Sequence, residues 1–177
     1  MVSAKQAENM AQDPSRRVGK HGSDARQSSR TAFSMCLMVY IGTAGELPTS
    51  SSPDLRIEAV SAARQDVRLW FSHPAVSFVG AHTGCSCGFP SIMAESPLDY
   101  YEGMPLQSDD RRADLRSVRA LLDLIGQALA RSDRVELYPV PDGDESKEPK
   151  GVIDWEMSSL EPERFFFNER FLHVVHR

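Results

Sequence analysis

The chain has 177 residues, a formal net charge of −5 and 41% hydrophobic residues. A chain of this length can form one domain whose hydrophobic core is stable without disulfide bonds or a structural metal. No apolar run approaches the roughly 18 residues that a membrane span needs, and three cysteines cannot form a closed set of disulfides. Because phosphate binding needs a basic surface, the acidic balance argues against nucleic acid as a partner. We therefore expect a reduced, cytoplasmic protein of bacterial type, with no membrane or nucleic-acid partner and with an unidentified small molecule or protein as its partner.

Residues 1–34 differ in composition from the rest of the chain. They hold six basic and three acidic residues, whereas residues 35–177 hold 14 basic and 22 acidic ones. This tail contains few large apolar side chains, so burial cannot offset the entropy lost on ordering it. We expect a disordered N-terminal tail over residues 1–34 and a single domain over residues 35–177. Because the apolar pattern begins at Met35, a translation start at that residue is an alternative.

Apolar runs and alternations predict the strands. The run 36–41 is continuously apolar, which is typical of a strand buried on both faces. Residues 55–59 and 135–138 alternate as half-exposed strands do, and residues 76–82 form another expected strand. The phenylalanines at 165–167 and the run 171–175 indicate a closing hairpin or one bent strand. Residues 141–150 are rich in charge and indicate a solvated surface turn.

Two helices are expected. Apolar residues recur at helical spacing over residues 63–71, and this short helix ends before His73 and Pro74. A longer helix extends from about Asp110 to Arg131 and carries an apolar stripe. The stripe consists of Leu115, Val118, Leu122, Ile125 and Leu129.

The order of these elements indicates the fold class. Strand–helix–strand patterns at 55–81 and at 76–140 favour crossover connections and hence some parallel pairing. The C-terminal β segments are expected to add antiparallel strands. We therefore predict an α/β or α+β fold: a single domain with a mixed β-sheet on which one long and one short helix pack.

The segment HTGCSCGF at 82–89 holds two of the three cysteines and directly follows a predicted strand. Its two glycines let the backbone turn tightly. It opens a stretch of about two dozen residues before the long helix, and loops of that length are often functional. This segment is therefore the place in the chain where chemistry is expected.

A metal site is the first hypothesis for this segment. Zinc accepts thiolate and imidazole ligands in a tetrahedral set. Cys85, Cys87 and His82 supply three of them, and Cys36 on the first strand is the candidate fourth ligand if that strand neighbours residues 76–82. His173 or His176 on the last strand is a substitute donor. Zinc is thus the candidate cofactor, although one Cys-x-Cys is less diagnostic than paired Cys-x-x-Cys motifs.

Three alternatives remain open. Neighbouring thiols can exchange with a disulfide, which makes Cys85 and Cys87 candidate catalytic residues of a thiol-based redox enzyme. Cys36 becomes an N-terminal nucleophile if Met35 is the start and is removed. Finally, free cysteines often pack as small hydrophobes, which would suit a non-enzymatic binding or regulatory module. The residues alone do not decide whether the protein is an enzyme.

Three segments carry a resemblance: MCLMVYIGT at 35–43, HTGCSCGF at 82–89 and the ending ERFFFNERFLHVVHR. In these segments the chain resembles a group of small bacterial proteins with no assigned activity. The resemblance implies a folded body that starts at Met35. It implies no reaction, cofactor or catalytic residue.

Overall fold

The computed structural model describes residues 36–93 and 111–177. The expected tail at 1–34 and most of the loop before the long helix therefore lie outside the described residues. The strands are β1 (Leu37–Thr43), β2 (Ser50–Ser51), β3 (Leu55–Ala59), β4 (Ala75–Ala81), β5 (Ser91–Ile92), β6 (Arg134–Pro141), β7 (Gly151–Glu156), β8 (Phe167–Asn168) and β9 (Phe171–His176). The helical elements are the α-helix α1 (Arg111–Leu129) and the 3₁₀ segments η1 (Ala62–Trp70), η2 (Ser86–Gly88) and η4 (Met157–Ser159).

Within the described residues, seven strands form one sheet in the order β2-β3-β4-β1-β6-β9-β7. The central strand β1 is antiparallel to both β4 and β6. Parallel pairing joins β7 to β9, and β5 to β8 in a separate two-stranded sheet. A mixed sheet with one long and one shorter helical segment packed on it confirms the predicted fold class.

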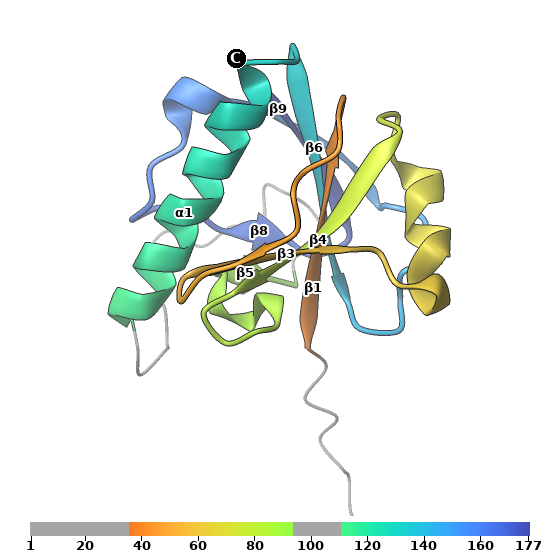
Figure 1. Ribbon diagram of the computed structural model, residues 1–177, viewed down its shortest axis with the longest axis horizontal. Coiled ribbons are helices and arrows are strands. Elements are labelled where there is room, and N and C mark those ends of the chain that lie inside the picture. The colour runs from red at the N-terminus through yellow and green to blue at the C-terminus, as the bar shows by residue number, and fades with distance from the viewer. Residues whose placement is uncertain (1–35, 94–110) are drawn as a thin grey trace, which may run out of the picture. The chain divides into compact units, whose positions relative to one another are not determined.

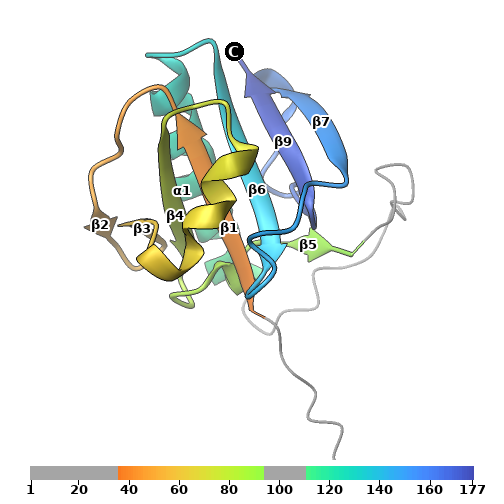
Figure 2. The same ribbon diagram turned by 90° about the vertical axis from the view of Figure 1, so that its right-hand side faces the viewer.

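The two longest helical elements, α1 and η1, lie on opposite faces of the sheet. Figures 1 and 2 show α1 on one side of β1 and η1 on the other. Side chains of β1 alternate accordingly: Leu37, Val39 and Ile41 belong to the core under α1. Met38 and Tyr40 belong to the core under η1. The prediction of a strand buried on both faces is therefore confirmed.

The long helix begins and ends close to the predicted positions. Its apolar face is buried against the sheet, with Val118, Leu121 and Ile125 fully inaccessible. Burying each such side chain stabilises the fold by about 1.5–3 kcal/mol, so this face holds α1 in place. No helix among the described residues is long and apolar enough to cross a membrane.

The predicted crossover connections are wrong. β3 and β4 pair antiparallel, with Leu55 opposite Ala81 and Ala59 opposite Ser77. The segment between them is the 3₁₀ segment η1, which lies over the sheet. After it the chain runs along β4 in the direction opposite to β3. β4 and β6 are not neighbours either, because β1 lies between them. Strand–helix–strand order alone did not reveal this reversal.

The prediction for the C-terminal segment is also wrong. Residues 165–175 form neither a hairpin nor one bent strand, because β8 pairs with β5 whereas β9 pairs with β6 and β7. The chain turns between β8 and β9 at Arg170, which adopts a left-handed backbone conformation with φ 66°. Strand β7 was not predicted, although its sequence GVIDWE alternates between exposed and half-buried positions.

The charged segment 141–150 is not simply a solvated turn, because Glu145 is 6% exposed. Its carboxylate accepts a hydrogen bond from the hydroxyl of Tyr40 at 3.0 Å and pairs with Nε of Arg64 at 2.8 Å. Its carbonyl accepts a hydrogen bond from the indole of Trp70. Burial and the neighbouring carboxylate raise the pKa of Tyr40. Glu145 therefore joins this loop to η1 and to β1.

Candidate metal centre

The three cysteines of the chain lie together at one end of β1. Cys36 directly precedes β1, and Cys85 and Cys87 flank Ser86 at the 3₁₀ segment η2. The three Sγ atoms all lie within 4.8 Å of one another. The thiols are free; Cys36 and Cys85 are half-buried and Cys87 is exposed. Figure 1 shows the start of β1 beside the loop that follows β4.

A tight turn after β4 brings Cys85 back towards the sheet. The backbone N–H of Gly84 donates to the carbonyl of Ala81 at 2.9 Å, and the N–H of Ala81 donates to the carbonyl of Cys85 at 2.7 Å. Gly84 has a φ of +82°, a conformation that glycine adopts without a steric penalty. The turn therefore depends on Gly84, which directly precedes Cys85.

Ser86 fixes the segment between the two thiols. Its side chain is fully buried, and its hydroxyl donates to the carbonyl of Val79 at 2.6 Å. The same oxygen accepts a hydrogen bond from the N–H of Val39 at 2.8 Å. Val39 and Val79 face each other in the pairing of β1 with β4, so Ser86 bridges the two strands at this rung. No pattern in the sequence distinguished Ser86 from an ordinary loop serine.

Hydrogen bonds from backbone N–H groups hold Cys87 and Cys36 in place. The N–H of Leu37, which follows Cys36, lies 3.3 Å from Sγ of Cys87 and donates to it. The carbonyl of Cys36 accepts a hydrogen bond from the N–H of Asp142 at 2.8 Å. The Cys87 sulfur is therefore held at the start of β1, and the backbone of Cys36 is held by the residue that follows β6.

Cys85 and Cys87 differ in their tendency to ionise. Burial disfavours the Cys85 thiolate, but hydrogen bonds from the Thr83 hydroxyl, from Cys87 and from Cys36 outweigh burial and lower the pKa of Cys85. Its sulfur lies 3.4 Å from Oγ1 of Thr83 and 3.4 Å from the backbone nitrogen of Cys87. Burial and the hydrogen bond to Cys85 raise the pKa of Cys87 to about 12. Of these two thiols, Cys85 therefore forms a thiolate more readily in the metal-free protein.

His82 does not join the three sulfurs in the described structure. Its backbone N–H donates to Oγ of Ser117 at 3.0 Å, and its Nδ1 lies 3.2 Å from the same hydroxyl. Its Nε2 is 3.8 Å from a carboxylate oxygen of Asp114, and both partners belong to α1. His82 therefore attaches the cysteine loop to α1, whereas the sequence indicated a zinc ligand.

The two substitute donors on β9 lie elsewhere. His173 is fully buried; its Nε2 is 3.1 Å from the carbonyl oxygen of Asn168, and its ring packs against that of Trp155, with centroids 4.1 Å apart and an angle of 35° between the planes. Nε2 of His176 lies 3.0 Å from the carboxylate of Asp154. Neither histidine belongs to the group of described residues that could share a metal ion with the sulfurs.

Comparisons with protein-family models, with curated proteins and with solved structures found no match to the chain. Function is therefore inferred from the cysteines and their surroundings. Three converging thiols that solvent can reach have two chemical uses, because thiolates bind soft metal cations and also act as nucleophiles.

Proposed function

We propose that Cys36, Cys85 and Cys87 together bind one thiophilic metal cation, with zinc as the first candidate. The observation that carries this proposal is the convergence of three sulfur atoms within 4.8 Å from two distant parts of the chain. Core packing alone does not account for their position, because none of the three side chains is fully buried. Thiolates are the ligands that zinc and monovalent copper favour.

The spacing of the sulfurs suits a single ion. With Zn–S bonds of about 2.3 Å, the sulfurs of a tetrahedral site lie about 3.8 Å apart. The cluster therefore needs only small side-chain rotations to close around the cation. Because Cys87 is exposed, water can reach the remaining coordination position, which is the arrangement of zinc sites with three protein ligands. Binding also releases protons, since the ligands must be thiolates.

Metal titration tests the proposal directly. Full-length protein stripped with a chelator is titrated with Zn²⁺ against a competing indicator, and with Co²⁺ while sulfur-to-metal charge-transfer absorption is recorded. We expect one equivalent of either metal to bind, and the cobalt-loaded protein to show the absorption typical of cobalt–thiolate bonds. The zinc affinity should fall at least about tenfold in each of the variants Cys36→Ser, Cys85→Ser and Cys87→Ser. Even the loss of a group that only hydrogen-bonds to a metal ligand lowers metal affinity by about tenfold.

The matched control is His82→Gln. This variant removes the imidazole that the sequence indicated as a ligand, but it leaves the three sulfurs in place. We expect its zinc affinity to equal that of the unmodified protein. The absence of saturable binding with one equivalent of Zn²⁺, or the retention of full affinity in any cysteine variant, would contradict the proposal.

A second candidate function is thiol–disulfide exchange, and the hydrogen bonds to the Cys85 sulfur favour it. A thiolate at Cys85 would attack a disulfide substrate, form a mixed disulfide and release one substrate thiolate. Cys36 or Cys87 would then attack Sγ of Cys85, which gives an internal disulfide and the second substrate thiol. Incubation of metal-free protein with oxidised glutathione, followed by mass spectrometry, tests this reaction. The absence of both glutathionylated and internally oxidised protein would argue against it.

A further inference from the structure

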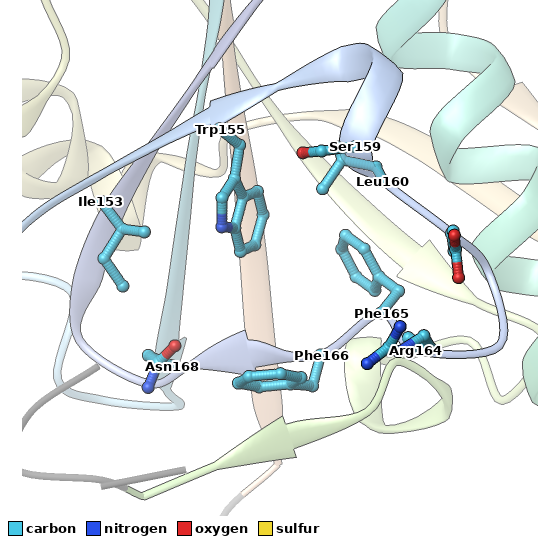
Figure 3. Close-up of a pocket in the computed structure, with 9 residues that line it drawn as sticks. Ile153, Trp155, Ser159, Leu160, Arg164, Phe165, Phe166 and Asn168 are labelled. Carbon is cyan, nitrogen blue, oxygen red and sulfur yellow. The ribbon is translucent and has the colours of Figure 1, made fainter. Parts of the chain in front are cut away.

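A pocket of about 300 Å³ lies beside β7 and shares no lining residue with the cysteine cluster. All of its lining residues lie between positions 153 and 168. Figure 3 shows the rings of Trp155, Phe165 and Phe166 around one space. The volume is at the lower end of the range for ligand pockets, so a fragment-sized molecule fits it.

The aromatic wall of the pocket is held rigidly by ring contacts. Trp155 meets Phe165 edge to face, with centroids 5.6 Å apart and an angle of 62° between the planes. The buried ring of His173 packs against that of Trp155 at an angle of 35°, and its centroid lies 5.4 Å from that of Phe167. Aromatic rings attract other rings in offset or edge-to-face arrangements. A planar aromatic ligand can therefore extend this cluster without rearranging it.

A buried amide lies at one end of the pocket. Asn168 is 3% exposed and lines the space, and Figure 3 shows its side chain below that of Ile153 at the edge of the pocket. Within the described part of the chain, its Nδ2 has no hydrogen-bond partner. Buried polar groups are normally paired, and leaving one unpaired is unfavourable. Because a carboxamide both donates and accepts, a hydroxyl on the ligand ring would give this end a partner.

A guanidinium lies at the other end. Figure 3 shows Arg164 on the side of Phe166 opposite Asn168. Arg164 is exposed, and its side chain forms no ion pair with the described residues. A planar guanidinium matches a carboxylate through two parallel hydrogen bonds. The carboxylate of Glu161 also lines the pocket and would oppose part of that attraction.

We propose that this pocket binds a small planar aromatic carboxylate with a hydrogen-bonding group on its ring, of the hydroxyphenyl-carboxylate class. The ring lies among Trp155, Phe165 and Phe166, the ring hydroxyl meets the carboxamide of Asn168, and the carboxylate meets Arg164. This assignment is independent of the metal proposal, since it depends on different residues.

The probe is 3-(4-hydroxyphenyl)propionate, and the signal is the indole N–H resonance of Trp155 in a ¹⁵N–¹H spectrum of the full chain. The chain has two tryptophans. The other, Trp70, lies in η1 and donates its indole N–H to Glu145, so it serves as an internal control. A ligand of about a dozen non-hydrogen atoms with ordinary ligand efficiency has a Kd on the order of 1 mM. We expect a saturable shift of Trp155 alone.

Analogues separate the three parts of the ligand without changing the protein. 3-Phenylpropionate lacks the hydroxyl and should bind about two- to tenfold more weakly, as expected for the loss of one hydrogen bond. 3-Cyclohexylpropionate lacks the aromatic ring and should bind more weakly still. Equal affinity of the cyclohexyl and phenyl compounds would overturn the proposal, and so would a Trp155 resonance that does not shift in a saturable way.

Two exposed charges provide opposite tests of the carboxylate. Arg164→Gln should weaken binding about two- to fivefold, the range expected for an exposed ion pair. Glu161→Gln should strengthen it, because it removes a repulsive charge. Arg56→Gln, an exposed arginine on β3 outside the pocket, is the matched control and should change nothing. Unchanged affinity in Arg164→Gln, or weaker binding in Glu161→Gln, would overturn the proposal.

Discussion

The hydroxyl oxygen of Ser86 lies 2.8 Å from the backbone nitrogen of Val39, a residue 47 positions away in the chain. The same hydroxyl donates to the carbonyl of Val79 on the neighbouring strand. One buried side chain therefore joins β1, β4 and the loop that carries Cys85 and Cys87. This link explains how thiols from distant segments come together.

Replacing Ser86 with alanine should damage both the fold and the metal site. The change leaves the Val39 N–H and the Val79 carbonyl without their partner, which costs about 1–3 kcal/mol for each buried polar group. We expect the free energy of unfolding in urea to fall by at least the cost of one such group, and the zinc affinity to fall with it. Ser132→Ala, at an exposed hydroxyl, is the control and should change stability by less than about 0.5 kcal/mol. Unchanged metal affinity in Ser86→Ala would contradict a positioning role for this hydroxyl.

Cys85 should react before Cys87. Hydrogen bonds from Thr83, Cys87 and Cys36 lower the pKa of Cys85, whereas the pKa of Cys87 is raised to about 12. Since alkylation requires the thiolate, iodoacetamide should label Cys85 before Cys87 in metal-free protein at neutral pH, as read by peptide mass spectrometry.

The pH dependence of that labelling has a definite direction. The rate at Cys85 should rise with pH through a pKa below the ordinary thiol value and then level off, while labelling of Cys87 stays slow. Thr83→Val removes the hydroxyl that lies 3.4 Å from the Cys85 sulfur, so it should shift the rise to higher pH. Preferential labelling of Cys87 would contradict this ordering of the thiols.

Periodicity predicted the elements whose signal is local. The continuous apolar run at 36–41 and the stripe from Leu115 to Leu129 depend only on neighbouring residues, and β1 and α1 occur where these patterns indicated. Pairing partners depend on distant segments. The reversed entry into β4 and the separation of β8 from β9 were therefore predicted wrongly.

In the candidate site, Cys36 joins the cluster as predicted, whereas His82 does not. Cys36 was named as a ligand on the condition that its strand neighbours residues 76–82, and β1 does pair with β4. His82 has the right residue type and spacing for a zinc ligand, yet its ring faces Ser117, 35 residues further along. A motif cannot indicate which way an imidazole turns when a helix from another part of the chain offers it a partner.

The buried His173 should make the fold sensitive to acid. Burial lowers the pKa of His173 from 6.5 to about 4, and its ring contacts, Trp155 and Phe167, are uncharged. In the unfolded chain the histidine takes up a proton near pH 6.5, so its stabilising contribution is complete above that pH. It is lost progressively as the pH falls to about 4. Between pH 6.5 and about 4, proton uptake by the unfolded chain therefore lowers the free energy of unfolding by about 3 kcal/mol.

Urea unfolding at several pH values measures this loss. The control is His173→Gln, which cannot take up a proton at this position and should show a shallower fall in stability between pH 6.5 and pH 4. All other ionisable groups are shared by the two proteins, so the difference in slope isolates His173. Identical slopes would show that the buried imidazole does not control acid stability.

Alanine substitutions at two glycines can distinguish the effect of the turn before Cys85 on zinc binding from the effect of backbone strain on stability. Gly84 and Gly143 have φ values of +82° and +88°, and a Cβ atom added at either would meet nothing within 4 Å. Alanine at each position should therefore lower the free energy of unfolding by about 1–2 kcal/mol through the backbone alone. Only Gly84→Ala should also weaken zinc binding, because Gly84 forms the turn that places Cys85. Gly84→Asn should recover part of both losses, since asparagine tolerates this conformation better. Equal zinc affinities in the two alanine variants would mean that the turn does not set the geometry of the sulfurs.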